Sequence, residues 1–179
     1  MKLIKTKFKD LIIYKKDTFK DNRGYFRELF LNNTINKKFP FDVMSFSKKN
    51  VLRGLHLQIK KPQGKFVTVL RGKIFDVALD CRKNSKTFGK HFSIILSENE
   101  NTSLYIPEGF AHGFCSLTHN TILHYRNSNY RNKKYETGIL WKDRDLKIKW
   151  PVRNPLISLR DKKNITYNKF LNSINFKKM

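Results

Sequence analysis

The sequence predicts an all-β fold, a sandwich or barrel with a few short helices. Runs rich in β-branched and aromatic residues recur about every 8–12 residues, turn residues stand between them, and helical periodicity is weak. The chain has 179 residues, of which 39% are hydrophobic, so it is long enough to bury a core without a disulfide or structural metal. We therefore expect a single domain over residues 1–179.

The expected strands follow one another along most of the chain. They are residues 11–14, 24–30, 43–47, 52–58, 65–70, 73–80, 91–96, 103–106, 113–117 and 121–126. Turn signals separate several of them, at 21–24, 62–64, 71–72 and 118–120. The runs FVTVL (66–70) and KIFDVAL (73–79) are joined only by Arg71-Gly72, which predicts a hairpin in the core.

Two short helices complete the predicted elements, at residues 32–37 and 168–176. In the second, Phe170, Leu171 and Ile174 fall on one helical face, so this helix could cap an open end of the barrel. The stretch from about residue 166 is also expected to be a basic tail.

The charge of the chain is strongly positive. Thirty-eight Lys and Arg stand against 14 Asp and Glu, a net charge of +24. The basic residues are spread along the whole chain, and no recognition helix or RNA-binding motif accompanies them. We interpret the excess as solvated surface whose field attracts an anionic substrate such as a nucleotide diphosphate, and we expect no nucleic-acid partner. A non-catalytic polyanion-binding protein is the alternative, which a salt titration of DNA binding would reveal.

The sequence also indicates in which cellular compartment the protein is expected. No apolar run approaches the ~20 residues of a membrane span, and charges interrupt the first sixteen residues, so we expect neither a membrane partner nor a signal peptide. Cys81 and Cys115 lie within apolar stretches. We expect them to be buried free thiols in a reducing cytoplasm.

Two histidines stand in motifs that carry chemistry. His56 lies in LRGLHLQ (52–58), and His112 closes PEGFAH (107–112), which resembles the second motif of cupins, the small jelly-roll barrels. In cupins the first motif supplies His-x-His and then a Glu as metal ligands. Here Gln58 replaces the second histidine, and residues 57–72 contain no carboxylate. Because metal catalysis usually needs three protein ligands, we expect a cupin without a metal or other cofactor, which disfavours a metal-dependent oxygenase.

Four motifs in order make the resemblance more specific. They are RGYFRE (23–28), VLRGLHLQ (51–58), IPEGFAHGF (106–114), and WKD (141–143) with IKWP (148–151). With them the chain closely resembles the dTDP-4-dehydrorhamnose 3,5-epimerase family over roughly residues 5–165. The resemblance implies a cupin jelly roll, a homodimer that exchanges N-terminal strands, and a nucleotide-diphospho-4-keto-6-deoxy-sugar substrate. The C4 ketone of such a sugar acidifies the hydrogens at C3 and C5, so a base can remove one and an acid can return it to the opposite face.

The resemblance also implies the catalytic residues. His56 stands at the position of the base, and Asp161 in SLRD (158–161) at that of its orienting partner. Tyr125, thirteen residues after His112, stands at the position of the acid. Lys65, nine residues after His56, stands at that of the cation that stabilises the enolate.

Substrate binding is assigned by the same resemblance. Arg23 and Arg53 would hold the diphosphate and the ring, because guanidinium groups suit phosphate oxygens. Phe26 and Glu28 would line the nucleotide pocket, and His112 would hydrogen-bond the sugar. The full set of implied substrate-binding residues is Arg23, Phe26, Glu28, Arg53, Gln58, His112 and Tyr130.

Departures from the family leave the substrate open. The family usually shows Q-x-N-x-S-x-S before the first histidine motif, whereas this chain has FDVMSFS (41–47), with Phe41 and Val43 in place of the amides. Arg131 replaces the second residue of a Tyr-Tyr pair. A GDP-linked substrate, a heptose, or inversion at C3 alone would fit these changes. A 3,4-ketoisomerase of the same fold is a further alternative, although a Tyr125 opposite His56 favours proton transfer on two faces.

Overall fold

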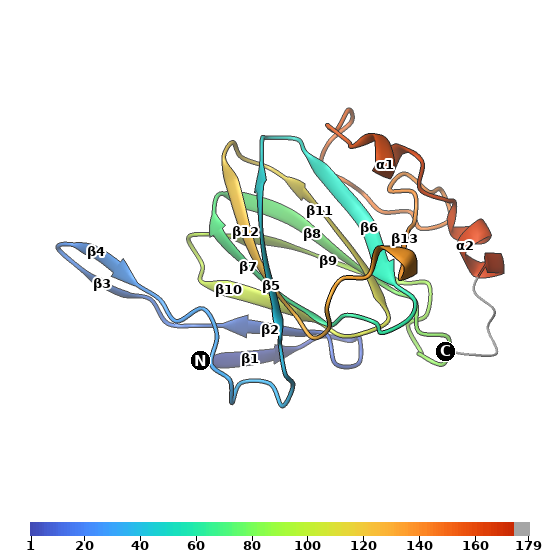
Figure 1. Cartoon of the computed structure of the whole chain (residues 1–179). Coiled ribbons are helices and arrows are strands. Elements are labelled where there is room, and N and C mark those ends of the chain that lie inside the picture. Colours follow the sequence, from blue (N-terminus) through green and yellow to red (C-terminus); the bar gives the residue numbers. More distant parts are fainter. Residues whose placement is uncertain (174–179) are drawn as a thin grey trace.

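Two antiparallel sheets pack face to face in the computed structural model, which describes residues 1–173 (Figure 1). The six-stranded sheet has the order β1 (Lys2–Lys5), β2 (Ile12–Lys15), β10 (Thr102–Ile106), β7 (Lys65–Arg71), β12 (Thr121–Asn127), β5 (Phe41–Ser47). The five-stranded sheet has the order β13 (Glu136–Gly138), β6 (Leu52–Gln58), β11 (Phe110–Ser116), β8 (Lys73–Asp80), β9 (His91–Ser97). This arrangement confirms the predicted all-β jelly roll.

The main core lies between the two sheets. Successive residues of a strand point to opposite faces, so Val67 and Val69 of β7 point inward together, as do Ile74 and Ala78 of β8. These four side chains are buried in one apolar cluster. The alternation also decides which residues can reach the space between the sheets, and that space holds the site described below.

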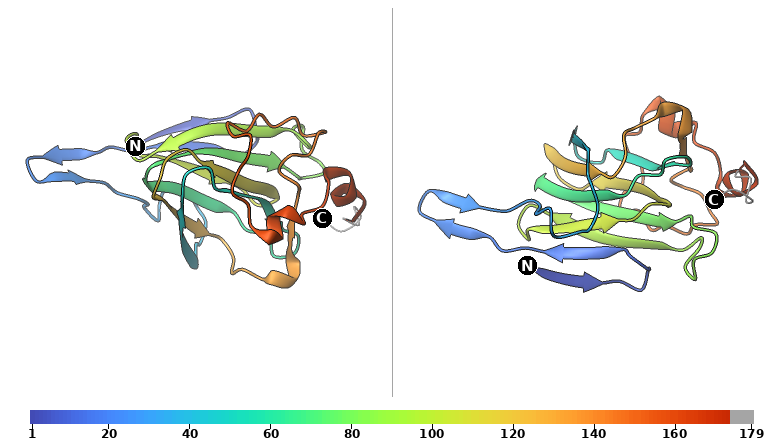
Figure 2. Two further views of the ribbon diagram at one scale, coloured as in Figure 1. Left: turned by 90° about the horizontal axis from the view of Figure 1, so that it is seen from above. Right: turned by 60° about the horizontal axis from the view of Figure 1, so that its bottom comes forward.

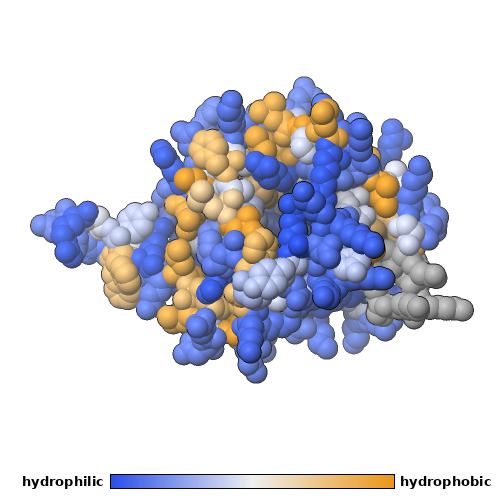
Figure 3. Space-filling view, viewed as in Figure 1, coloured by the Kyte–Doolittle hydropathy of each residue, from blue (hydrophilic) through white to orange (hydrophobic). Residues whose placement is uncertain are grey.

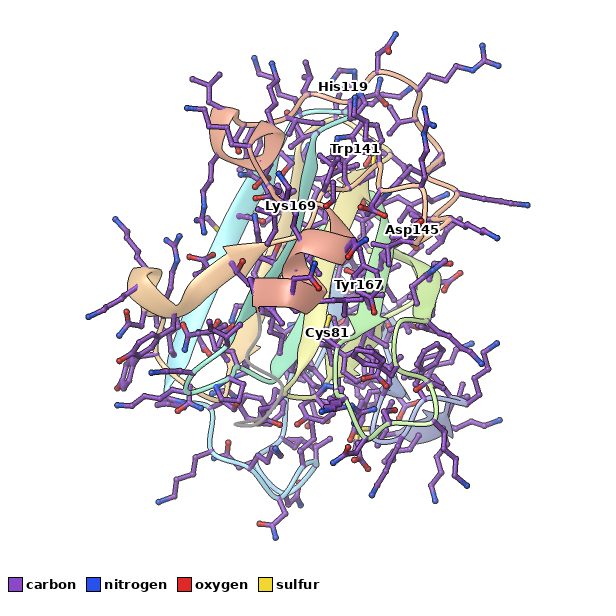
Figure 4. All side chains as sticks on the ribbon, turned by 90° about the vertical axis from the view of Figure 1, so that its right-hand side faces the viewer. Cys81, His119, Trp141, Asp145, Tyr167 and Lys169 are labelled. Carbon is purple, nitrogen blue, oxygen red and sulfur yellow. The ribbon has the colours of Figure 1, made fainter. Side chains whose placement is uncertain are left out.

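A second core covers the outer face of the five-stranded sheet. Leu55 and Val77 point outward from β6 and β8, and Ile139, Leu146 and Phe170 of the C-terminal segment pack over them. This segment contains the short helices α1 (Leu159–Lys162) and α2 (Tyr167–Ser173). Figure 4 shows α2 lying across the strands on this face, with Tyr167 and Lys169 labelled.

The predicted core hairpin at 66–79 is wrong. Strand β7 pairs with β10 and β12, whereas β8 pairs with β11 and β9 in the other sheet. The Arg71-Gly72 turn therefore carries the chain from one sheet to the other. Gly72 has a φ of +85°, and a Cβ there would lie 2.5 Å from the Thr118 hydroxyl, so the tight crossing requires glycine. Val67, Val69 and Ile74 meet through side chains in the core and not through backbone pairing.

The prediction of a helix at 32–37 is also wrong, because this stretch forms turns. The amide of Thr34 donates to the carbonyl of Leu31, and Ile35 packs on a small aromatic cluster that includes Phe66. The second predicted helix is confirmed over Tyr167–Ser173, where Phe170 is fully buried. It does not cap an open end of the barrel as expected, because Phe170 packs with Leu55 and Val77 on the outer face of the five-stranded sheet. Its predicted end, with Ile174, lies outside the described residues. The chain is thus packed on the barrel up to α2, beyond the residue 166 at which the basic tail was expected.

Short strands escaped the prediction. These are β1, β3 (Phe19–Asp21) and β13, each of three or four residues, and a single 3-10 turn at Lys133–Tyr135 lies before β13. Both cysteines are free and buried, as predicted. Within residues 1–173, no helix has the length and apolar character needed to cross a membrane.

The hairpin of β3 and β4 (Gly24–Phe26) projects from the body of the molecule (Figures 1 and 2). Phe19, Tyr25 and Phe26 on it are 59%, 57% and 64% exposed. In Figure 3 the hairpin tip is hydrophilic, while apolar side chains lie nearer its base. Large apolar side chains that stay exposed on a projecting arm are typical of a surface that contacts another molecule.

Candidate active site

A cavity of about 350 Å³ opens between the two sheets. His56 and His112 point into it from neighbouring strands of the five-stranded sheet, where the two residues stand opposite each other in the β6–β11 register. Lys65 and Tyr125 enter it from β7 and β12 of the six-stranded sheet. The cavity therefore has two walls that carry different chemistry, because each wall belongs to a different sheet.

His56 is paired with Asp161. Its Nε2 lies 2.5 Å from Asp161 Oδ1, and Asp161 Oδ2 accepts from the backbone N–H of Gly54 at 3.2 Å. Asp161 is only 3% exposed and is placed by helix α1, whose N-cap Ser158 accepts from the Asp161 N–H at 3.0 Å. With Nε2–H donated to the carboxylate, Nδ1 of His56 carries the lone pair that can accept a proton.

Two opposing effects act on the pKa of Asp161. Burial raises this pKa. The hydrogen bond and charge of His56, the Gly54 N–H and the nearby Arg160 together lower it by more, so the net pKa of Asp161 lies below its usual value. The carboxylate is therefore ionised at neutral pH. It can orient the His56 imidazole and stabilise the imidazolium that forms when His56 takes a proton.

Two glycines bring the histidine strands together. A Cβ on Gly54 would lie 2.6 Å from the Gly113 Cα and 2.7 Å from the His112 carbonyl, and Gly54 has a φ of +118°. A Cβ on Gly113 would lie 2.8 Å from the Arg53 carbonyl. Because neither position has room for a side chain, β6 and β11 approach closely beside His56 and His112.

His112 has a carboxylate partner of its own. Its Nε2 lies 2.8 Å from Asp76 Oδ2, and both side chains are buried. Asp76 reaches His112 because it lies on the inward face of β8, the strand that neighbours β11. The Asp76 carboxylate fixes the ring of His112 within the cavity wall, about 6.2 Å between centroids from the ring of Tyr125.

Tyr125 faces the histidines from the opposite sheet. Its hydroxyl lies 3.1 Å from the Ser45 hydroxyl on β5, and burial raises its pKa above the usual value. The phenol is therefore neutral over the physiological range and can donate its proton only to a strong base. Lys65 lies on the same sheet, and burial lowers its pKa to about 8, against the opposing influence of Glu136 and Asp76.

Three arginines line the cavity as well. Arg53 donates to the Ser47 hydroxyl at 3.3 Å and to the Phe46 carbonyl at 3.0 Å, which holds its guanidinium at the wall. Arg131 and Arg160 both contact Glu136, which also lines the cavity. Such a concentration of guanidinium groups suits an anionic ligand with several oxygens.

The remaining residues named from the sequence lie elsewhere. Arg23 and Phe26 are on the projecting hairpin, apart from the cavity of the same chain, and Glu28 follows that hairpin on the surface. Gln58 is 5% exposed and its amide is bonded to backbone groups. Tyr130 is 67% exposed, with its ring 6.0 Å from that of Phe41 at the cavity.

Sequence reasoning missed Asp76 and Glu136 and gave Ser45 no role. Asp76 carried a usable signal, since an isolated acid within the apolar run KIFDVAL needs a buried partner. Glu136 is one of only 14 acidic residues against 38 basic ones, so the sequence already suggested that it would pair with basic side chains. Neither contact could be assigned, because each depends on which strands are neighbours.

The fold and the site define a class. A jelly-roll barrel carries a His–Asp pair on one wall, a neutral phenol on the other and cations around them, while residues 1–173 hold no group of three or more His, Cys, Asp or Glu suited to a metal. Such a barrel is suited to moving protons on and off an anionic substrate, as sugar epimerases of the cupin fold do.

Comparison with known proteins identifies the family. The model of the dTDP-4-dehydrorhamnose 3,5-epimerase family matches residues 5–169. The chain is 45% identical over 168 residues to the enzyme of that name from Shigella flexneri, covering 90% of this chain and 93% of that one. It is 43% identical to the one from Methanothermobacter thermautotrophicus, over 90% and 91% of the two chains.

A solved structure agrees. The 3,5-epimerase of Legionella pneumophila in complex with dTDP-4-keto-L-rhamnose matches with a TM-score of 0.90 and 36% identity, over 98% of this chain and 95% of that one. The chain belongs to the dTDP-4-dehydrorhamnose 3,5-epimerase family and is an isomerase.

Proposed function

We propose that the protein inverts C3 and C5 of a dTDP-linked 4-keto-6-deoxy sugar, in deoxysugar synthesis for a surface polysaccharide. The observation that carries the reaction is the position of His56 and Tyr125 on opposite walls of one cavity. The names of the relatives, and the ligand of the Legionella structure, favour dTDP over GDP. The two free cysteines of this chain, Cys81 and Cys115, favour a cytoplasmic location, where thiols stay reduced.

The chemistry follows from the two walls. Nδ1 of neutral His56 removes the proton next to the ketone, and Asp161 stabilises the resulting imidazolium. Negative charge develops on the C4 oxygen, where the Lys65 ammonium would stabilise it. Tyr125 then donates a proton from the opposite face, which inverts the carbon. Hydrogen leaves and returns as a proton, so this route needs neither a nicotinamide nor a metal.

The test is proton exchange followed in heavy water. The protein is incubated with dTDP-4-keto-6-deoxyglucose, and NMR follows deuterium entry at C3 and C5 together with the configuration of the product. We expect exchange and inversion at both carbons, in the presence or absence of chelator. Exchange at C3 alone would show a single epimerisation, and movement of the keto group from C4 to C3 would show a ketoisomerase. A parallel titration with GDP should give weaker binding than with dTDP.

Lys65 predicts a specific pH dependence. Its pKa is lowered to about 8 by burial, so the ammonium is present below that pH and is lost as the pH rises through it. We expect the turnover rate to decline above about pH 8, approaching tenfold for each further pH unit. A Lys65→Arg variant keeps its charge throughout, so its profile should stay level to higher pH whatever its absolute rate. An unchanged basic limb in that variant would assign the decline to another group.

We also propose a homodimer in which the β3–β4 hairpin completes the partner's cavity. The hairpin carries Arg23 and Phe26 away from the cavity of its own chain, and it exposes Phe19 and Tyr25 beside them. A second copy would bury these apolar side chains and gain a guanidinium for its substrate.

Substitution on the hairpin tests the dimer. Phe26→Asp should shift the molecular mass measured by light scattering from dimer towards monomer and weaken dTDP binding about tenfold or more. Ile95→Asp on edge strand β9 is the control, since Ile95 is 53% exposed and outside the hairpin. A wild-type protein that is monomeric at all concentrations would contradict the proposal.

A further inference from the structure

The Gln58 side chain hydrogen-bonds to the backbone on both sides of Arg131. Its amide Nε2 donates to the carbonyls of Lys61, at 2.5 Å, and Tyr130, at 3.4 Å, while its Oε1 accepts from the Asn132 N–H at 2.8 Å. Gln58 is 5% exposed, so these bonds form away from competing water. The side chain two residues after His56 thus fixes the position of the loop that carries Arg131.

Glu136 fixes the other end of the Arg131 side chain. Its Oε2 accepts from Arg131 Nε at 3.0 Å and Nη2 at 2.9 Å, and the Arg160 Nη2 lies 3.1 Å from the same oxygen. Glu136 is placed by its pairing with Gln58 across β13 and β6. One carboxylate oxygen therefore holds two guanidinium groups side by side at the cavity, and the three side chains keep a net positive charge.

Both guanidinium groups retain donors for a ligand. An arginine has five N–H donors, and Arg131 uses those of Nε and Nη2 on Glu136. The side chains of Arg131 and Arg160 are 45% and 48% exposed, whereas that of Glu136 is 14% exposed. The cations thus lie on the open side of the cluster and the carboxylate lies behind them.

We propose that Arg131 is a substrate-binding residue that takes the diphosphate of the nucleotide sugar together with Arg160, and that Gln58 is its positioning residue. The proposal rests on the proposed nucleotide-sugar function. Phe41 and Val43 line the same cavity but bring no side-chain hydrogen-bond donor. The arginines of the wall therefore supply the donors for the diphosphate. Arg53 is already assigned to it by the family resemblance, and Arg131 adds a second guanidinium whose side chain is held by Glu136 and whose loop is held by Gln58.

Binding measurements test the proposal. Titration calorimetry with dTDP, inorganic pyrophosphate and thymidine is run on wild type, Arg131→Gln, Arg131→Lys and a control, Arg153→Gln, which changes the charge equally at an exposed residue outside the cavity. We expect Arg131→Gln to weaken dTDP and pyrophosphate binding about tenfold or more, with thymidine and the control unaffected. Arg131→Lys should recover only part of the loss, because it cannot form the paired contact with Glu136.

Gln58 is tested through its partner. Gln58→Met should weaken dTDP binding in the wild-type background but have little further effect in Arg131→Gln, because a positioning residue acts through the group it holds. Equal effects of Gln58→Met in both backgrounds would limit Gln58 to a general structural role.

The outcomes separate the two proposals. If Arg131→Gln binds dTDP as tightly as wild type, or if its affinity for thymidine falls by the same factor as its affinity for dTDP, the role of Arg131 is overturned and the epimerase function still stands. A wild-type protein that binds pyrophosphate through Arg131 but exchanges no sugar hydrogens would overturn the epimerase function alone. A wild type that binds neither dTDP nor pyrophosphate would overturn both.

Discussion

His56→Asn is expected to abolish deuterium incorporation at C3 and at C5 alike. Asparagine keeps a polar side chain next to Asp161 but cannot accept a proton at neutral pH, so the enolate does not form. The expected loss in turnover is about a thousandfold or more. Asp161→Asn should cause a smaller loss, on the order of a hundredfold, because His56 remains but is poorly oriented and its imidazolium is less stable.

The control for this result is His119→Asn. His119 is exposed in the turn between β11 and β12, far along the chain from the dyad and labelled in Figure 4. Its substitution removes an imidazole without touching the cavity, so exchange and turnover should stay at the wild-type level. Substantial exchange that survives in His56→Asn would place the base elsewhere, and His112 with its Asp76 partner would then be the first candidate.

Tyr125→Phe is expected to separate exchange from inversion. The phenylalanine ring can keep its edge contact with His112, while the hydroxyl that faces Ser45 is lost. His56 can still remove and return a proton on its own face, so deuterium should enter the substrate with its configuration retained. Formation of the inverted product should fall about a hundredfold or more, because no acid remains on the opposite face.

Product configuration and exchange are measured in the same NMR experiment, so the ratio of the two is independent of how much protein is active. Tyr167→Phe serves as the control, since Tyr167 lies on α2 over the outer face of the five-stranded sheet. Equal losses of exchange and inversion in Tyr125→Phe would mean that the phenol supports the cavity wall and does not deliver the proton.

The sequence was informative where structure is local. Strands β6 and β8 have the bounds expected from their composition, and the alternation along β6 and β11 is what aims His56 and His112 at one space. Asp161, 105 residues away from His56, could be paired with it only through family resemblance, because nothing in its neighbourhood specifies that distant contact.

What sequence could not supply is the assignment of strands to sheets. The short Arg71-Gly72 connection is compatible with a hairpin and with a crossing between sheets, and only the packing of Val67 and Val69 against Ile74 decides for the crossing. The same assignment determines that Asp76 reaches His112. It also determines that β13 lies beside β6, which places Glu136 next to the residues that line the cavity.

The C-terminal covering of the outer sheet face has a consequence for following the folding of this protein. Both of its tryptophans, Trp141 and Trp150, belong to the segment that brings Asp161 to His56. Trp150 packs on Phe75 of β8 at 5.7 Å and donates its indole N–H to the Trp141 carbonyl. Intrinsic fluorescence therefore reports the docking of this segment, and during refolding its slowest change should coincide with the return of turnover, since such long-range contacts are expected to form late.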